Sequence, residues 1–334
     1  MQPVNGGLLT SAHRADPEYG QLLESVRRNM AGNLKERLPL YAGGLCEGAA
    51  ELLAASLFED LPDCRPVLLL CPDEKRCADL KEVLAAFGVR ASVFPGRDLN
   101  TRNITASHEF EHLRLSVLLS LASGEPDAVI TTPDAAVGIT MPLKLLNELT
   151  VRVSEETGTS PEALCGALLR AGYVRSELAE GPGQFAVRGG IVDICFASDE
   201  AGLRDSRGGI AAVRTEFFGD EIDRICLFDP DSQRVTRKIS GFTVPPAFEV
   251  IPGPEGLEKI AECERELLRK ATREIEKGKA DRRLAELLEA ELSDAASAAA
   301  AGTQINFADR YISLIYPGQP CLLDYLEGCP LCIY

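Results

Sequence analysis

The sequence predicts an α/β protein in which a parallel sheet domain carries an inserted α+β domain. Three observations support this fold class. Strand-length apolar runs alternate with helical periods between residue 38 and about residue 140, short strands with glycine turns follow from residue 151, and residues 43–50 have the glycine spacing of a phosphate-binding loop. A chain of 334 residues exceeds one hydrophobic core of ordinary size, so we expect two or three compact units.

The first segment, residues 1–37, is a polar arm in which we expect one helix near residues 19–30. Residues 38–42 have the composition of a short apolar strand, and apolar residues recur at helical spacing from 49 to 61. Strand, glycine turn and helix is the order that a phosphate-binding loop requires.

The loop itself has the sequence GGLCEGAA at residues 43–50. A working loop supplies a lysine to the β and γ phosphates and a hydroxyl to Mg²⁺. Gly43 and Gly48 keep the glycine spacing, whereas Ala49 and Ala50 replace the lysine and the hydroxyl residue. We therefore expect a degenerate P-loop NTPase-like domain, with no catalytic residue and no nucleotide cofactor. The alternative is an ordinary β-to-α turn in which two glycines lie five apart by chance.

The rest of this first domain, residues 38–150, repeats strand and helix. A helix is expected after the N-cap Asp73, and Asp134 is expected to cap another helix. Successive βα units predict a doubly wound parallel sheet. The predicted strands are residues 67–71, 91–94 and 128–132, with a helix at 107–122.

A change of pattern near residue 150 marks the inserted domain, residues 151–246. A helix is expected at 160–171, and short strands surround it in sequence, including a hairpin whose turn is Gly219-Asp220. Residues 247–334 are expected to return to the first domain through a charged helical stretch and two strands, at 311–316 and 331–334.

Composition excludes several classes of function. The net charge of −16 repels nucleic acid, and no stretch of about 18 apolar residues predicts a membrane span. Eleven cysteines without paired spacing and the absence of a signal peptide favour a cytoplasmic location. No cysteine and histidine set has the spacing of a metal site, so we expect none.

Four strings carry a family resemblance: FAVRGGIVD at 185–193, EFFGDEIDRI at 216–225, FDPDSQR at 228–234 and LLDYL at 322–326. They resemble the UvrB-homology region of bacterial excision repair, which UvrB shares with the N-terminal third of the transcription-repair coupling factors (Mfd). The resemblance runs from about residue 38 to the last residue and is closer to the coupling factors. UvrB has a complete P-loop and a tyrosine-rich hairpin that grips damaged DNA, and residues 94–108 contain no tyrosine.

The resemblance implies a non-catalytic module that recruits UvrA in transcription-coupled nucleotide excision repair. It also implies an N-terminal piece, truncated before the acidic pair of the next family motif. The longer parent would be an ATP-dependent DNA translocase that displaces stalled RNA polymerase. In such a parent, RNA polymerase, double-stranded DNA, ATP and Mg would belong to further domains, and a C-terminal domain would cover the UvrA surface. The alternatives are a UvrB-like damaged-DNA-binding domain and a nucleotide-binding domain.

The resemblance also implies the residues that face UvrA. Arg175 follows the Gly-Tyr turn, Arg188 ends the Phe-x-Val-Arg string, and Phe185 begins it, so these three are the expected partner-binding residues. Ala186 stands where the family has a further arginine. Two alternatives remain open: Arg188 pairs with Asp193 or Glu216 within its own sheet, and Phe185 is a core residue.

Overall fold

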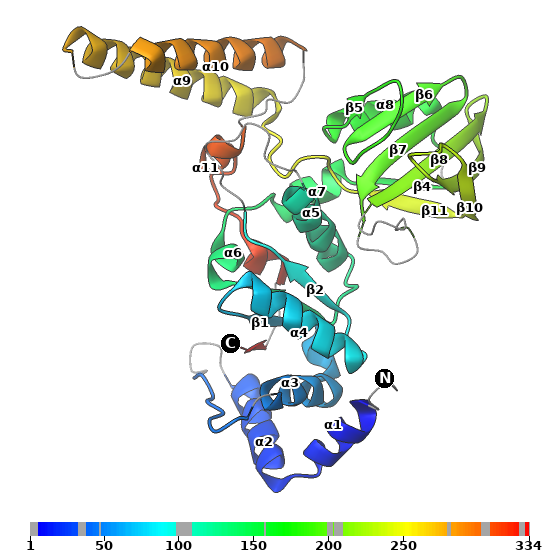
Figure 1. The fold of residues 1–334 in the computed structure, drawn as a ribbon, viewed down its shortest axis with the longest axis vertical. Coiled ribbons are helices and arrows are strands. Elements are labelled where there is room, and N and C mark those ends of the chain that lie inside the picture. Colours follow the sequence, from blue (N-terminus) through cyan, green and yellow to red (C-terminus); the bar gives the residue numbers. More distant parts are fainter. Residues whose placement is uncertain are drawn as a thin grey trace. The chain divides into compact units, whose positions relative to one another are not determined.

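The structure is a computed structural model that describes residues 6–32, 38–46, 48–97, 109–156, 158–198, 203, 210–278, 282–301, 308–326 and 331–333. The chain divides into two compact units (Figure 1). Unit 1 comprises residues 1–97, 120–138 and 322–334, and unit 2 comprises residues 98–119 and 139–321.

Unit 1 is built on a parallel sheet with the strand order β12-β1-β3-β2. The strands are β1 (Val67–Leu70), β2 (Ala91–Phe94), β3 (Ala128–Thr131) and β12 (Cys332–Ile333). Every pairing is parallel. The predicted parallel sheet is therefore confirmed, and so is the return of the last strand to it. β3 is buried along its whole length, as expected for an interior parallel strand.

Helices supply the apolar side chains that cover this sheet. The polar arm contains two helices rather than one, and Tyr19, Phe58 and Leu84 represent the shared core. Asp73 caps its helix as predicted, because its carboxylate accepts from the backbone N–H of Arg76. The helices are α1 (Gly6–Arg14), α2 (Pro17–Ala31), α3 (Ala49–Asp60), α4 (Glu74–Ala86) and α6 (Pro133–Val137), with short 3-10 turns η2 (Pro62–Cys64) and η4 (Leu322–Leu326).

Two local predictions for this unit are wrong. Residues 38–42 form no strand: the backbone of Leu38 bonds the side-chain amide of Asn29 through both its N–H and its C=O, at 3.3 and 2.7 Å, instead of joining the sheet. Thr132, not Asp134, occupies the cap position of α6, because Pro133 takes the first helical position. Asp134 accepts a hydrogen bond from Thr132, which lowers the pKa of Asp134.

Unit 2 contains a six-stranded sheet with the order β10-β9-β8-β7-β6-β5. Its pairings are antiparallel except for the parallel β5–β6 pair. A second sheet pairs β4 (Val151–Ser154) with β11 (Gly241–Val244). The strands of the larger sheet are β5 (Val174–Arg175), β6 (Gln184–Arg188), β7 (Ile191–Ala197), β8 (Ile210–Phe218), β9 (Glu221–Phe228) and β10 (Val235–Ile239). The predicted hairpin around Gly219-Asp220 is confirmed as β8–β9.

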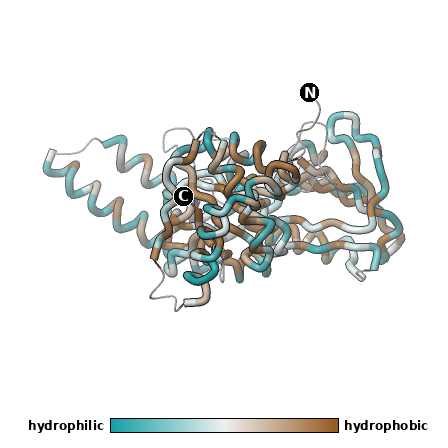
Figure 2. The backbone as a smooth tube through the Cα atoms, turned by 90° about the horizontal axis from the view of Figure 1, so that it is seen from below, coloured by the Kyte–Doolittle hydropathy of each residue, from teal (hydrophilic) through white to brown (hydrophobic). Residues whose placement is uncertain are grey.

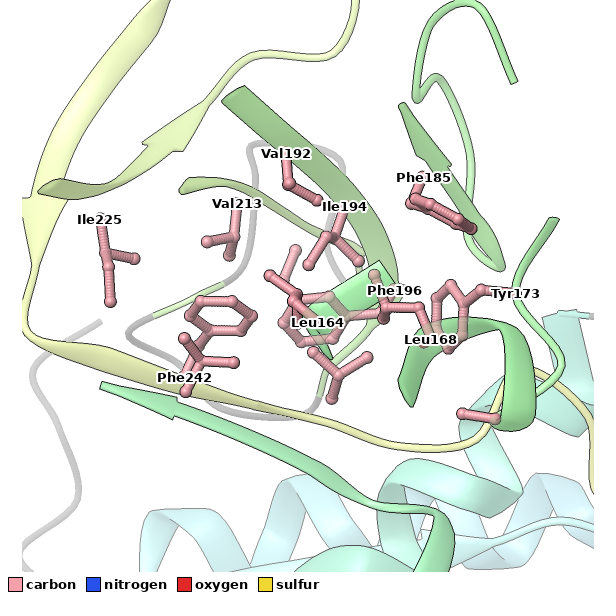
Figure 3. Packing of buried hydrophobic residues seen from close by; sticks show 14 of the residues in the cluster. Leu164, Leu168, Tyr173, Phe185, Val192, Ile194, Phe196, Val213, Ile225 and Phe242 are labelled. Atoms are coloured by element: carbon pink, nitrogen blue, oxygen red, sulfur yellow. The ribbon is translucent and has the colours of Figure 1, made fainter. Parts of the chain in front are cut away.

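One face of this sheet packs on α8 (Pro161–Arg170), whose N-cap is Ser160. Leu164 and Leu168 of the helix insert among Val192, Ile194 and other inward-pointing strand residues (Figure 3). The buried members of this cluster also include Tyr173, Phe185, Phe196, Val213, Ile225 and Phe242. α5 (Glu109–Ala122) and α7 (Leu143–Leu149) complete the helices that precede the domain in sequence.

Thr215 places a hydroxyl in this apolar cluster. Its strand partners are Val192 and Ile225, the residue is fully buried, and its Oγ1 has no hydrogen-bond partner among the described residues. We expect Thr215→Val to raise the free energy of unfolding by about 1 kcal/mol, because the unpaired hydroxyl is removed while the branched shape stays. Urea unfolding checks this. Thr140→Val is the matched control and should destabilise, since the Thr140 hydroxyl donates to Glu249.

The last part of unit 2 is helical. α9 (Gly253–Glu276) and α10 (Arg282–Ala301) pair with each other, and η3 (Ala308–Tyr311) and α11 (Ile312–Ile315) follow (Figure 1). In Figure 2 the α9–α10 pair, at the left, is coloured mostly hydrophilic. The strand predicted at 311–316 is wrong. One hydrophobic cluster contains residues of α9 together with Tyr311, Ile312 and Ile315. The spacing of these three residues in the sequence suits a helical turn and not the alternation of a strand.

Glu264 of α9 is fully buried and accepts a hydrogen bond from the Tyr311 hydroxyl. Burial raises its pKa, and the carboxylate of Glu291, itself paired with Arg310 at 2.5 Å, raises it further. The pKa of Glu264 is higher in the folded than in the unfolded protein. The folded protein is therefore favoured at pH values below the unfolded pKa, and this stability is lost as the pH rises through the folded pKa. We therefore expect Glu264→Gln to raise the melting temperature at pH 7 but not at pH 4. A circular dichroism melting series checks this, and an equal effect at both pH values would contradict it.

Candidate partner-binding surface

The glycine loop leads into α3 (Ala49–Asp60). Gly48 takes a left-handed backbone conformation (φ 83°) at the N-cap, which suits glycine. Glu51, in the first turn of α3, is buried and bonds the Arg76 guanidinium. Burial opposes its ionisation, but the hydrogen bond and charge of Arg76, together with a backbone hydrogen bond at Glu51, outweigh burial and lower the pKa of Glu51. The N-terminus of a helix can bind a phosphate, but the first turn of α3 already contains the carboxylate of Glu51.

The expected partner-binding residues lie in unit 2, where Arg188 ends β6. Its Nη2 donates to Asp193 Oδ2 at 2.6 Å and to Gln233 Oε1 at 3.3 Å. The alternative of an ion pair within the sheet is thus confirmed for Asp193. The Arg188 side chain nevertheless remains 44% exposed, whereas that of Asp193 is 1% exposed.

Asp193 is the centre of a small polar network on this face of the sheet. Arg214 of β8 donates to both of its oxygens, from Nε at 2.7 Å and from Nη2 at 2.9 Å. The same guanidinium lies over the ring of Phe228, with its carbon 4.9 Å from the centroid. Gln233 closes the network, since its backbone carbonyl accepts from Arg214 Nη1 at 3.2 Å. Two arginines therefore share one buried carboxylate, which leaves one positive charge in excess.

Arg175 and Arg188 do not share a face of the sheet. Arg175 on the edge strand β5 is in register with Phe185, so its side chain leaves the sheet on the core side. Burial raises the pKa of Cys165 on α8, and the nearby Arg175 charge opposes this rise. Arg188 is three residues after Phe185 and therefore points to the opposite face, with Asp193. The two arginines can meet one partner only around the edge of the sheet.

Phe185 is 1% exposed and belongs to the core cluster (Figure 3). Its expected role as a partner-binding residue is therefore corrected: it cannot contact a partner in this conformation, because alternation along β6 directs it inward. The core alternative is confirmed. Phe185 supports the strand that carries Arg188.

Gly189 and Gly190 shape the turn that presents Arg188. Gly189 has a left-handed backbone (φ 60°), and a Cβ on Gly190 would lie 2.8 Å from the Phe217 carbonyl oxygen. The Phe217 N–H in turn donates to the Gly190 carbonyl at 2.7 Å. The two glycines therefore allow the backbone conformation of the β6–β7 turn and its close approach to the end of β8.

Sequence reasoning missed Arg214 and Gln233. A signal for Arg214 exists, because Arg214 and Glu216 alternate with Val213, Thr215 and Phe217 along one strand. Gln233 had no such signal, since its role depends on a left-handed backbone (φ 58°). Within the described ranges, no group of three metal-ligating side chains is found, and no helix is long and apolar enough to span a membrane.

Comparison with known proteins supports the resemblance. Residues 151–249 match the family described as UvrB interaction domain. The chain is 27% identical to the transcription-repair-coupling factor of Bacillus subtilis over 313 residues, which cover 93% of this chain. It is also 31% identical over 221 residues to UvrABC system protein B of Ralstonia nicotianae, and 29% identical over 286 residues to that of Thermus thermophilus. These two alignments cover 61% and 78% of this chain.

The matched regions are only part of these relatives. They amount to 25% of the Bacillus subtilis protein, 30% of the Ralstonia protein and 40% of the Thermus protein. The chain thus spans about a quarter of the coupling factor that it matches. Residues 151–249 are thus similar to the UvrB interaction domain family, and the chain that contains them resembles the UvrB-homology region of transcription-repair coupling factors.

Proposed function

We propose that this chain is a non-catalytic UvrB-like module that recruits UvrA to sites of transcription-coupled repair, with Arg188 in the contact. The carrying observation is the way in which Arg188 is held. Only its Nη2 has partners among the described residues, Asp193 and Gln233. Nε–H and Nη1–H point to different sides of the guanidinium, and each can donate a hydrogen bond to a partner carboxylate.

This arrangement serves recognition because the arginine is positioned before a partner arrives. Its exposed side chain is fixed by a buried carboxylate, which reduces the rotamer entropy lost on binding. The excess positive charge beside Asp193 favours an acidic partner surface over nucleic acid, and the net charge of −16 has the same consequence.

The proposal that the module is non-catalytic rests on the glycine loop. Ala49 and Ala50 supply neither the positive charge nor the metal-binding hydroxyl of a working loop. ATP, Mg, RNA polymerase and double-stranded DNA would then be handled by other domains of a longer translocase parent. The similarity to a transcription-repair-coupling factor supports this assignment.

The test is the dissociation constant for purified cognate UvrA of single-site variants of the whole chain, with folding verified by circular dichroism. Arg188→Ala and Arg188→Lys should each weaken binding, the first by about 30-fold, which corresponds to an interface hot spot of about 2 kcal/mol. Arg152→Glu, an exposed residue of β4, is the control and should bind as wild type does. Arg175→Ala shows separately whether the opposite face takes part. Unchanged binding of folded Arg188→Ala would remove Arg188 from the contact.

A further inference from the structure

Phe218 is the most exposed large apolar residue among those described, at 84%, and it ends β8. We infer that Phe218 is the apolar anchor of the UvrA contact, and that it acts with the row Arg188, Ile191, Glu216 and Arg224. These five residues are called the turn-end patch. The inference rests on the proposed function and specifies its contact: the partner presents an apolar pocket bordered by carboxylate on the Arg188 side.

The register of the sheet makes these residues neighbours. Arg188 pairs with Ile191, Ile191 with Glu216, and Glu216 with Arg224, so the row crosses four strands on one face. Adjacent strands lie about 4.8 Å apart. The β8–β9 register shifts between Glu216 and Phe217, but Phe217 packs on the core cluster, so the next residue, Phe218, leaves the sheet on the opposite face, that of Glu216, about 7 Å further along. Phe218 is thus within reach of any partner that contacts the row.

Phe218 also has a rigid base. The preceding residue, Phe217, packs against the core cluster, and its N–H donates to Gly190 at 2.7 Å. Phe218 pairs with Glu221 across the turn, where Gly219 takes a left-handed backbone (φ 65°). An aromatic side chain has few rotamers to lose on binding, and this one stands on a backbone that is fixed on both sides. Aromatic residues, phenylalanine among them, and arginine are enriched at protein interfaces relative to the rest of the surface.

The charges of the patch give the partner an orientation. Arg224 donates to both carboxylate oxygens of Glu216, at 2.8 and 2.9 Å, so this pair is internally neutralised. Arg188 shares Asp193 with Arg214, and its Nε–H and Nη1–H have no partner among the described residues. Asp220 and Glu221 add negative charge at the turn itself. A partner carboxylate is therefore favoured over Arg188 and disfavoured over the turn.

The experiment compares Phe218→Ala with Leu169→Ala in the whole chain, using purified cognate UvrA. Leu169 is the matched control, because it is 56% exposed in the same unit but lies on α8, the helix that covers the other face of the sheet. Phe218→Ala should raise the dissociation constant by at least about tenfold, as loss of a hot-spot residue does. Leu169→Ala should leave it unchanged. A photo-crosslinking amino acid at position 218, but not at 169, should label UvrA.

The outcomes separate this inference from the proposed function. If Phe218→Ala binds as wild type does while Arg188→Ala is weakened, the anchor is wrong and the recruitment of UvrA stands. An equal loss of UvrA affinity in Leu169→Ala would also contradict the anchor role of Phe218. If the wild-type chain does not bind UvrA, both the anchor role of Phe218 and the proposed recruitment of UvrA are wrong. Because Phe218 is exposed, its variant should keep the wild-type urea midpoint, and a shifted midpoint would show that Phe218 is structural and overturn the anchor.

Discussion

Replacement of Glu249 by alanine is expected to lower the free energy of unfolding of unit 2 by about 3–5 kcal/mol, the range for breaking one side of a buried ion pair. Arg114 donates to both Glu249 oxygens, from Nε at 2.8 Å and from Nη2 at 2.9 Å. The two side chains are 2% and 1% exposed. Without Glu249, the Arg114 charge would lose this buried counterion, and the Thr140 hydroxyl would lose its acceptor.

The same residue joins separate segments through its backbone. Its N–H donates to Glu111 Oε1 at 2.6 Å, and its carbonyl accepts from the Tyr316 hydroxyl at 3.1 Å. The measurement is urea unfolding followed by far-ultraviolet circular dichroism. Glu155→Ala is the control, because Glu155 pairs with Lys238 at the surface and its loss should change the midpoint far less. Similar midpoints for the two variants would contradict the role given to Glu249.

Replacement of Phe185 by alanine is the second large effect, with an expected loss of about 3–5 kcal/mol for a buried phenylalanine. The side chain packs near Tyr173 and Ile194 in the core (Figure 3). Any loss of UvrA binding should therefore follow unfolding, and Phe185→Leu should recover both stability and binding. Urea unfolding and a binding titration on the same samples check this. A variant as stable as wild type that fails to bind UvrA would instead make Phe185 a contact residue.

The sheets could be predicted because their signals are local. Val67 to Leu70 is a continuous apolar run that matches a buried parallel strand, and Phe217 and Phe218 precede a Gly-Asp turn that matches a hairpin. The return of Cys332 and Ile333 to β1 was also accessible from an apolar end segment. Each of these segments has a pattern that one type of structure explains.

Other elements depend on distant partners. Residues 38–42 are apolar, yet the Asn29 side chain and not a neighbouring strand bonds Leu38. Residues 311–316 have strand composition, but Tyr311 bonds Glu264 of α9 and the segment turns as a helix. Composition alone does not distinguish these cases, because the partner that decides each one lies far along the chain.

Individual residues of the candidate site could be predicted from the sequence, but their arrangement on the two faces of the sheet could not. Arg188 and its possible partner Asp193 follow from the sequence, whereas the placement of Arg175 on the opposite face follows only from the β5–β6 register. A shift of one residue in that register would reverse the face. The register also places Phe218 near the end of β8, two strands away from Arg188, which no local pattern indicates.

We proposed that this chain binds UvrA through residues 151–249, the segment similar to the UvrB interaction domain. Its most direct test is a titration of the whole chain with purified cognate UvrA, followed by addition of excess UvrB. We expect a saturable complex that UvrB displaces, because both proteins would present a similar domain to one site. No complex, or a complex in which UvrB and this chain occupy UvrA together at that site, would contradict it.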